Sequence, residues 1–294
     1  MPTPVNTTPV NTTPVDLSLL GGWIGRSETA TETLTPELAR RFAATLGCRC
    51  DPAPGAAAPL LIHLCIAPPA AAMDELGRDG HPAKGGFLPP VPLPRRMWAG
   101  GAFRFHDAPR IGEDLTRRST VTDITLKQGR TGPLCFVTVE HDITGGDARP
   151  LLTERQDIVY RGEAADTAVK DAPPPAPAGA RQRRITPTPT LLFRYSALTF
   201  NGHRIHYDAP YARQVEGYPG LVVHGPMLAT LLCHFAAEIN GQPPGAFRFR
   251  SLSTLFDDAA FTLHATPDGD GLRLWAARDG GPVAMEAWAG GSTP

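Results

Sequence analysis

The sequence lacks the features that mark a membrane protein, a nucleic-acid-binding protein or a secreted protein. No apolar run approaches the roughly 18 residues that a membrane-spanning helix requires. The formal net charge is −1 and no long basic stretch is present. The chain does not open with a basic segment followed by an apolar core, so no secretory signal is expected. We therefore expect a cytoplasmic protein that binds neither membrane nor nucleic acid.

The sequence is also poor in cysteine, and the spacing of its cysteines indicates neither a disulfide framework nor a structural zinc site. The number is odd, no C-x-x-C is present, and the closest pair is separated by a single residue. We expect reduced thiols, most of them packed as small apolar side chains. The five are Cys48, Cys50, Cys65, Cys135 and Cys233.

A proline-rich stretch divides the 294 residues into two parts of similar design. Residues 1–16 repeat a Thr/Pro unit and predict a disordered tail, or a segment that lies over a partner subunit. Residues 17–165 and 185–294 each read as a helix followed by several antiparallel strands, with a linker at 166–184 between them. The arginines at 181–184 are interpreted as a solvated part of that linker. The fold class predicted from the pattern is α+β with one helix per half.

In the first half, Thr35-Pro36 predicts a helix start and Gly47 its stop. Residues 60–66 read as a short strand in which His63 is packed rather than a ligand. Residues 67–99 show little periodicity, and irregular segments of this length are usually functional or mobile. Later strands are predicted at 103–105, 116–127, 134–141 and 153–160.

The second half contains the clearest helical pattern of the chain. Pro226 fits the first helical position, Asn240-Gly241 fits the stop, and a strand is predicted at 191–195 before the helix. Free N–H groups at a helix start can stabilise a carbonyl oxygen that becomes negative, although Gly225-Pro226 can also be only a helix-start device. The apolar face recurs at helical spacing: Met227, Leu228, Leu231, Leu232, Phe235 and Ile239. Strands follow at 247–256, 260–265, 272–277 and 283–288.

A polar loop before this helix gathers side chains that can bind or move protons. Within eight residues it holds Asn201, His203, His206, Tyr207 and Asp208. Histidine titrates near neutrality and suits general acid–base catalysis. Asp208 reads as a loop-capping carboxylate or, alternatively, a base. The spacing of the two histidines could suit a metal, but no third ligand stands at a clear spacing, so no metal is expected.

The loop and the helix start resemble the R-specific enoyl-thioester hydratases, the MaoC-like family. That family has a loop of the form G-D-x-N-P-[LIV]-H-x-D-P-x-x-A, and residues 200–212 here read FNGHRIHYDAPYA. His206 falls on the family's histidine, Asp208 on its second aspartate and Ala212 on its last alanine. His224-Gly225 matches the family's HG helix start. The sequence is most similar to the branch that contains mesaconyl-C4-CoA (3-methylfumaryl-CoA) hydratases and mitochondrial-type hydroxyacyl-thioester dehydratases.

The branch resemblance also covers residues 87–101, FLPPVPLPRRMWAGG, and extends over most of the chain, from about Trp23 to Trp288. One position departs from the wider family, which has an aspartate where this chain has Asn201. An amide does not accept a proton at neutral pH. The resemblance to the branch implies that asparagine is usual there, so the site is not interpreted as inactive.

The resemblance implies a double hot-dog fold, in which two antiparallel sheets each wrap around a central helix. The first half would be non-catalytic and would shape the acyl pocket. The implied activity is reversible hydration of an enoyl-CoA thioester to a 3-hydroxyacyl-CoA, with mesaconyl-C4-CoA or a related short branched dicarboxylic acyl-CoA as substrate. His206 would be the general acid/base, Asn201 would orient water, and the Gly225 N–H would stabilise the thioester oxygen. No cofactor is needed, and a homodimer is expected.

Further residues are expected to contact the substrate, and other functions remain open. An acyl-carrier-protein-linked dehydratase would run the same chemistry, and a non-catalytic protein would only bind the thioester. A thioesterase would need an acid on the central helix, but Glu238 lies near the end far from Gly225. The Arg95-Arg96 pair could instead be a plain surface feature. The candidate substrate contacts are His203, Tyr207, Asp208, His224 and Trp98, with Arg95, Arg96 and Arg204 as candidates for a substrate carboxylate or phosphate.

Overall fold

The described part of the chain comprises residues 15–129, 132–162 and 173–291 of a computed structural model. The predicted tail lies almost wholly outside these ranges, as does the first part of the predicted linker. The domain boundaries drawn from the sequence therefore remain predictions. Among the described residues, no helix is long and apolar enough to cross a membrane.

The first half contains five strands and two helices. The helices are α1 (Leu17–Leu20) and α2 (Pro36–Leu46), and short 3₁₀ turns lie at Gly21–Trp23, Ile62–Cys65 and Met73–Glu75. The strands are β1 (Ser27–Thr33), β2 (Arg95–Phe105), β3 (Asp114–Gly129), β4 (Gly132–Thr144) and β5 (Pro150–Arg161).

The second half repeats this composition with more helix. Its helices are α3 (Pro189–Leu198), α4 (Ala209–Gln214) and α5 (Gly225–Asn240), with a 3₁₀ turn at Arg204–His206. Its strands are β6 (Arg181–Ile185), β7 (Ala246–Ser251), β8 (Phe261–Asp268), β9 (Gly271–Arg278) and β10 (Val283–Gly290).

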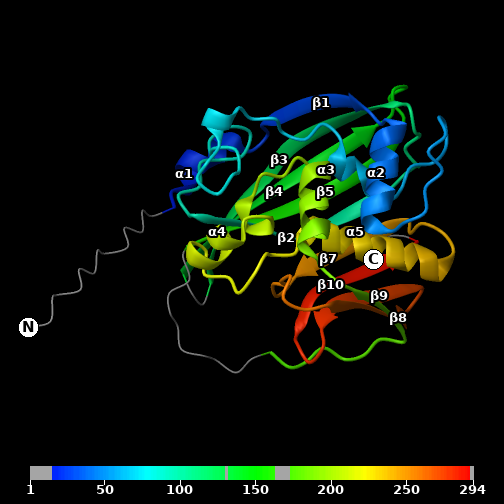
Figure 1. Ribbon diagram of the computed structural model, residues 1–294. Helices are drawn as coiled ribbons and strands as arrows, with labels where there is room; N and C mark the ends of the chain where they lie inside the picture. The colour runs from blue at the N-terminus through cyan, green and yellow to red at the C-terminus, as the bar shows by residue number, and fades with distance from the viewer. Residues whose placement is uncertain (1–14, 130–131, 163–172, 292–294) are drawn as a thin grey trace, which may run out of the picture.

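The described strands form one continuous antiparallel sheet in the order β1-β3-β4-β5-β2-β7-β10-β9-β8-β6 (Figure 1). Counted inward from its outer edge, the first half has the order β1-β3-β4-β5-β2 and the second half has the matching order β6-β8-β9-β10-β7. The two halves meet where β2 pairs with β7. At this seam a Cβ on Gly100 would lie 2.8 Å from the carbonyl oxygen of Phe249, so glycine permits the close approach. The double hot-dog prediction is confirmed, with the two expected sheets joined into one.

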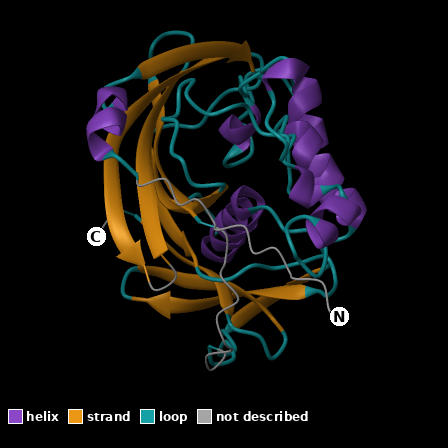
Figure 2. Cartoon of the chain, turned by 90° about the vertical axis from the view of Figure 1, so that its left-hand side faces the viewer, coloured by secondary structure: helices purple, strands orange, loops and turns teal. Residues whose placement is uncertain are grey.

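The sheet curves around α5, which Figure 2 shows nearly end-on inside the curve. Nine residues of α5 are buried, and they pack against apolar side chains of β7 to β10. Each fully buried Leu or Phe contributes about 1.5–3 kcal/mol. The predicted helix is confirmed, including its stop, where Gly241 adopts φ 72°; it begins at Gly225, one residue before the predicted first position Pro226. The start of α2 is confirmed as well, because the Thr35 hydroxyl accepts the Leu38 N–H at 3.2 Å.

Two predicted strands are wrong. Residues 191–195 belong to α3, which begins because the Thr188 hydroxyl accepts the Leu191 N–H at 3.2 Å and Pro189 fills the first helical position. Residues 60–66 contain the 3₁₀ turn Ile62–Cys65, which is entered through Leu61 at φ 61°. His63 in that turn is packed, as expected, and its Nε2 lies 3.1 Å from a buried carboxylate oxygen of Glu154.

The end of the predicted linker is also structured. Residues 181–185 form the edge strand β6, which pairs with β8 from Arg181↔Ala265 to Ile185↔Phe261. An edge strand tolerates an arginine-rich sequence because its side chains can reach water. All five cysteines are free thiols, and the last three in sequence are buried, as expected.

Candidate active site

His206 ends the 3₁₀ turn of the polar loop and is buried, with 7% of its surface exposed. Its Nδ1 lies 2.7 Å from the carbonyl oxygen of Val222 and therefore donates to it as Nδ1–H. In return, the Val222 N–H donates to the Ile205 carbonyl at 2.9 Å. These two bonds fix the imidazole and leave Nε2 with a free lone pair, which is the form that a general base requires.

His224 lies directly on His206 and is fully buried at the N-cap of α5. The two rings stack with their centroids 3.7 Å apart, and Nε2 of His224 lies 2.8 Å from the Ser196 hydroxyl of α3. Burial lowers the pKa of His206 to about 4 and holds the pKa of His224 well below its usual value. Both imidazoles are therefore neutral at neutral pH.

Asn201 uses its side-chain oxygen within the loop. Oδ1 accepts the His203 N–H at 3.0 Å, and the Asn201 N–H donates to the Ser196 carbonyl at 2.8 Å. Among the described residues, its side-chain NH₂ has no acceptor. That amide can donate to a water molecule but has no capacity to take a proton from it.

Three predicted substrate contacts have their polar atoms engaged in the loop itself. Asp208 is the N-cap of α4, accepting the Tyr211 N–H at 3.0 Å, and it also accepts Arg204 Nε at 3.0 Å and Nη2 at 2.8 Å. The bonds from Tyr211 and Arg204 lower the pKa of Asp208. The Tyr207 hydroxyl donates to the Gly202 carbonyl at 2.9 Å. Of the two interpretations of Asp208, the geometry supports the capping carboxylate.

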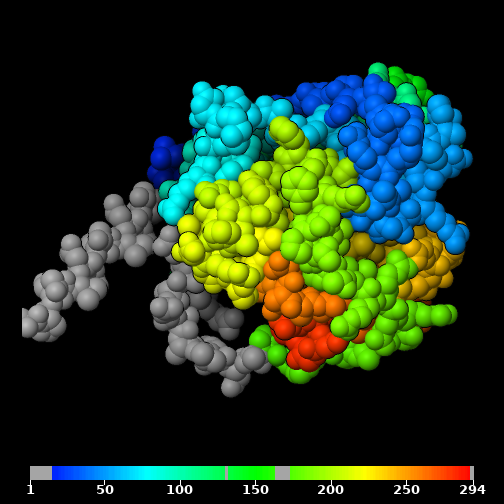
Figure 3. Space-filling model, viewed as in Figure 1, coloured from blue at the N-terminus to red at the C-terminus, as the bar shows by residue number. Residues whose placement is uncertain are grey.

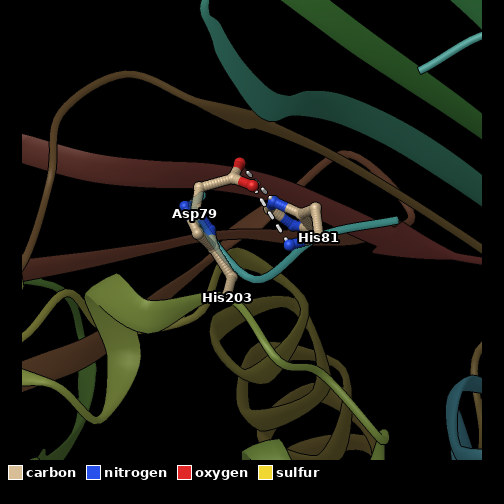
Figure 4. A group of neighbouring side chains, drawn as sticks. All are labelled: Asp79, His81 and His203. Carbon is tan, nitrogen blue, oxygen red and sulfur yellow. Dashed lines mark hydrogen bonds and ion pairs between the residues drawn. The ribbon is translucent and has the colours of Figure 1, made fainter. Parts of the chain in front are cut away.

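The first half of the chain contributes two residues that the sequence analysis missed, Asp79 and His81. Nδ1 of His81 lies 2.9 Å from Asp79 Oδ2, and the His81 N–H donates to Oδ1 at 3.1 Å (Figure 4). The His81 ring lies 4.0 Å from that of His203, which meets His206 edge-on at 5.3 Å. The only signal in the sequence was the irregularity of residues 67–99, which gives no partner for them.

Among the described residues, one group of side chains could by its geometry hold a metal ion. The donor atoms of Asp79, His81 and His203 all lie within 4.8 Å of one another. The chemistry of the surroundings favours another use. The carboxylate already accepts His81 Nδ1–H, and the nearby positive charge of Arg96 acts to lower the pKa of both histidines. A hydrogen-bonded Asp–His pair beside a cation is better suited to proton chemistry than to holding a second cation.

Gly225 is the first residue of α5. The first N–H groups of a helix have no acceptor within it and carry partial positive charge. A Cβ on Gly225 would meet no other atom within 4 Å, so space is open beside this backbone. Gly225 directly follows His224, and hence the helix start and the stacked imidazoles border the same place.

The three candidate arginines differ in whether their charge is already paired. Arg204 is held by Asp208. Arg95 donates to the Glu216 carbonyl at 3.2 Å and lies 3.8 Å from the Glu216 carboxylate. Within the described ranges Arg96 forms no ion pair; burial raises the pKa of the Tyr160 hydroxyl, and the positive charge of Arg96 beside it acts in the opposite direction. Arg96 is thus the candidate that can offer its guanidinium to a ligand.

The surroundings of Arg96 suit a ligand that carries an anion. Arg96 pairs in register with Tyr160 of β5, whose buried hydroxyl has no partner among the described residues. Trp98 lies two residues further along β2, on the same face of the strand, and packs edge-on against Phe249 at 4.8 Å. The ammonium of Lys84 lies 5.7 Å from the centre of the Tyr160 ring.

The chain is similar to known proteins over most of its length. The family model for hydroxyacyl-thioester dehydratase type 2 matches residues 61–257. A mesaconyl-C(4)-CoA hydratase of Chloroflexus aurantiacus is 46% identical over 276 residues, covering 90% of this chain and 95% of that protein.

Solved structures agree at the level of the fold. A MaoC-like dehydratase superposes with a TM-score of 0.67 over 93% of this chain and 100% of its own, at 14% identity. A Mycobacterium tuberculosis protein described as having a double hot-dog fold gives 0.57 over 90% of this chain and 95% of its own, at 17% identity. From the family model and the extent of the sequence identity, we conclude that the chain belongs to the hydroxyacyl-thioester dehydratase type 2 family.

Proposed function

We propose that this enzyme is a hydro-lyase that adds water reversibly across the C2=C3 bond of an enoyl-CoA thioester and so forms a 3-hydroxyacyl-CoA. The observation that carries the proposal is His206, a buried neutral imidazole with Nε2 free, placed beside the open start of α5. The extensive identity with a mesaconyl-C(4)-CoA hydratase supports this chemistry and points to a short branched dicarboxylic acyl-CoA as substrate.

In the hydration direction, His206 Nε2 accepts a proton from water as the water oxygen bonds to C3. The electron pair of the double bond moves toward C2 and the thioester oxygen, which receives a hydrogen bond from the Gly225 N–H at the helix start. The proton on His206 then forms the C2–H bond, so the enzyme returns to its first state. General acid–base catalysis of this kind typically contributes about 10²–10⁴-fold. Asn201 helps to orient the water through its free NH₂.

The substrate carboxylate of a dicarboxylic acyl-CoA needs a cation within the site. We assign this role to Arg96, because Arg95 and Arg204 are held by acidic side chains. We assign Tyr207 and Asp208 to holding the loop rather than to substrate contact. Trp98, His203 and His224 remain proposed walls of the acyl site.

The alternative functions are less well supported. A thioesterase would need a free acid near the helix start, but Glu238 lies toward the other end of α5 and pairs with Arg183. An acyl-carrier-protein-linked dehydratase uses the same groups in the reverse direction and is separated only by its substrate. The free thiols support a cytoplasmic location, and the exposed edges of hot-dog sheets favour a homodimer.

The experiment is a substrate panel on the wild-type enzyme. Crotonyl-CoA, mesaconyl-C4-CoA and the matching acyl-carrier-protein thioesters are followed by loss of enoyl absorbance, with a thiol reagent present. We expect hydration without free thiol, fastest for mesaconyl-C4-CoA. Release of thiol would make the enzyme a thioesterase. Tight binding of every thioester without turnover would make it a non-catalytic binding protein.

A further inference from the structure

The site contains two histidines prepared in the same way, one from each half of the chain. His206 donates its Nδ1–H to the Val222 carbonyl, and His81 donates its Nδ1–H to the Asp79 carboxylate. In both, Nε2 is left as an acceptor. The two rings flank His203, at 5.3 Å and 4.0 Å between centroids, and His81 is near enough to His206 to act on its pKa, so the three imidazoles form one cluster.

We propose that Asp79 and His81 form a carboxylate–imidazole dyad that holds and polarises the attacking water together with His206. His81 would be a catalytic residue because its Nε2 contacts the water. Asp79 would be a positioning residue that fixes the tautomer of His81. The inference rests on the proposed hydration chemistry and adds a second proton acceptor to it.

Asn201 makes a second acceptor necessary. A water molecule that attacks C3 is best activated when both of its hydrogens are bonded to acceptors, because its oxygen lone pair then points at the carbon. The Asn201 oxygen is bonded to the His203 N–H, and its NH₂ is only a donor. Asp79, bonded to His81, brings a carboxylate to this cluster from the other half of the chain.

The turn that carries the dyad is fixed onto the catalytic loop through backbone contacts. The Arg204 N–H donates to the Asp79 carbonyl at 2.9 Å, and Arg204 Nη1 donates to the Arg78 carbonyl at 3.2 Å. A Cβ on Gly80 would overlap the carbonyl of Gly202, and one on Gly202 would lie 2.7 Å from the Gly80 oxygen. In the space-filling view, the cyan surface of this part of the first half lies directly against the yellow-green surface of the loop region (Figure 3).

The charges around His81 keep the dyad ready to accept a hydrogen bond. The groups that face it are Asp79 and Lys84 from its own segment, Arg96 from β2, and His203 and His206 from the catalytic loop. Burial and Arg96 lower the pKa of His81, while Asp79 opposes them. His81 is therefore neutral at neutral pH, with its Nε2 unprotonated.

The proposed step is balanced without a co-reactant. Water donates one hydrogen bond to His206 Nε2 and the other to His81 Nε2. One O–H bond breaks and its proton goes to His206, while the oxygen forms the bond to C3. The proton on His206 then forms the C2–H bond, and the other hydrogen stays on the new hydroxyl group, bonded to His81.

The test uses Asp79→Asn and His81→Ala in the full-length enzyme, with mesaconyl-C4-CoA as substrate. We expect kcat to fall about 10²-fold or more in both variants, with KM little changed. Added imidazole should raise the activity of His81→Ala about tenfold. A purely structural role of His81 would not allow this rescue. His106→Ala is the control, because the His106 imidazole is bonded to Thr153, away from this cluster; it should behave as wild type.

Two further measurements keep the proposal open to refutation even if a variant folds poorly. Histidine ¹⁵N NMR of the wild-type enzyme should show His81 protonated on Nδ1 and bare on Nε2; the opposite tautomer would overturn the proposal. Treatment with EDTA should leave kcat unchanged. Loss of activity that added zinc restores would instead make Asp79, His81 and His203 a metal site.

The failure of this proposal is distinguishable from failure of the proposed function. If the wild type hydrates the substrate and His206→Ala does not, the proposed function stands. If Asp79→Asn and His81→Ala then retain nearly full kcat, only the dyad is wrong. If the wild type hydrates nothing, the function itself is wrong, whatever the tautomer of His81.

Discussion

The imidazole rings of His206 and His224 are stacked, with their centroids 3.7 Å apart and their planes 17° from parallel. A proton on one ring would place a positive charge on a buried group, directly against the other ring. Burial lowers the pKa of His206 and keeps the ring neutral, while the Val222 carbonyl decides which nitrogen holds its single proton. A base of this kind is active over a wide range of pH below neutrality.

The first prediction concerns the pH dependence of catalysis. A base acts only when it is unprotonated, so activity falls as the pH drops through its pKa. Because burial lowers the pKa of His206 to about 4, the acidic limb of kcat/KM should lie near pH 4 to 5 rather than near 6.5. The measurement is the hydration rate between pH 4 and 8 in buffers of constant ionic strength. An acidic limb near pH 6.5 would contradict the burial argument.

The second prediction concerns stability. The folded pKa of His206 is below the value of about 6.5 in the unfolded chain, so the unfolded state binds the proton more tightly. The stabilising contribution is complete above pH 6.5 and is lost as the pH falls toward 4. It amounts to about 3 kcal/mol from His206. Urea unfolding at pH 7.5, 5.5 and 4.5 should show this loss, and His206→Gln should make the profile flatter; equal profiles would refute the assignment.

The sequence predicted well those parts of the fold that depend on local pattern. The apolar spacing of α5, the Pro226 start and the Gly241 stop are all local signals, and the helix lies where they place it, with its start one residue earlier at Gly225. The catalytic loop was found because its histidines and Asn201 are close together in the chain. The strand predicted at 191–195 is wrong because that prediction followed the composition of these residues alone, whereas Thr188 caps a helix there and Pro189 begins it.

The parts of the site that the sequence did not predict are those that depend on contacts between the two halves of the chain. Asp79 and His81 are more than a hundred residues from His203, and no periodicity relates them to the loop. The sequence likewise offered Arg95, Arg96 and Arg204 as equals. Only the positions of Glu216 and Asp208 in space show that two of these arginines are already paired.

The third prediction tests the docking of the two halves at the catalytic loop. In Gly80→Ala the new methyl group would overlap the Gly202 carbonyl, on top of the strain of an alanine at φ 85°. Gly55 is the matched control, because it has φ 83° and open space around its Cβ position. Gly55→Ala should cost about 1–2 kcal/mol of stability, and Gly80→Ala about 1–3 kcal/mol more.

Urea unfolding measures the stability of the two variants, and the hydration assay measures their activity. Gly80→Ala should also lose most of its activity under conditions where it is folded, because the turn that carries Asp79 and His81 is displaced. Gly55→Ala should keep the wild-type kcat. Equal stability and equal activity of the two variants would show that the Gly80–Gly202 contact is unimportant.

The fourth prediction concerns recognition of the substrate carboxylate. Arg96→Gln should reduce kcat/KM for mesaconyl-C4-CoA by about 10–100-fold, the size of a lost hydrogen-bonded charge pair. Crotonyl-CoA has no second carboxylate and should be affected much less. Arg104→Gln is the control, because Arg104 lies on the same strand but is exposed. It should leave kcat/KM unchanged for both substrates. Equal losses for both substrates would assign Arg96 to the coenzyme or to the fold.

The most direct test of the central claim is the single-turnover hydration rate of His206→Gln, measured at saturating mesaconyl-C4-CoA beside the wild type and His106→Gln. The claim that His206 is the general base predicts a fall of about 10²–10⁴-fold in His206→Gln alone. Unfolding curves recorded on the same samples show that each protein is folded. A folded His206→Gln enzyme that hydrates the substrate at the wild-type rate would contradict the claim.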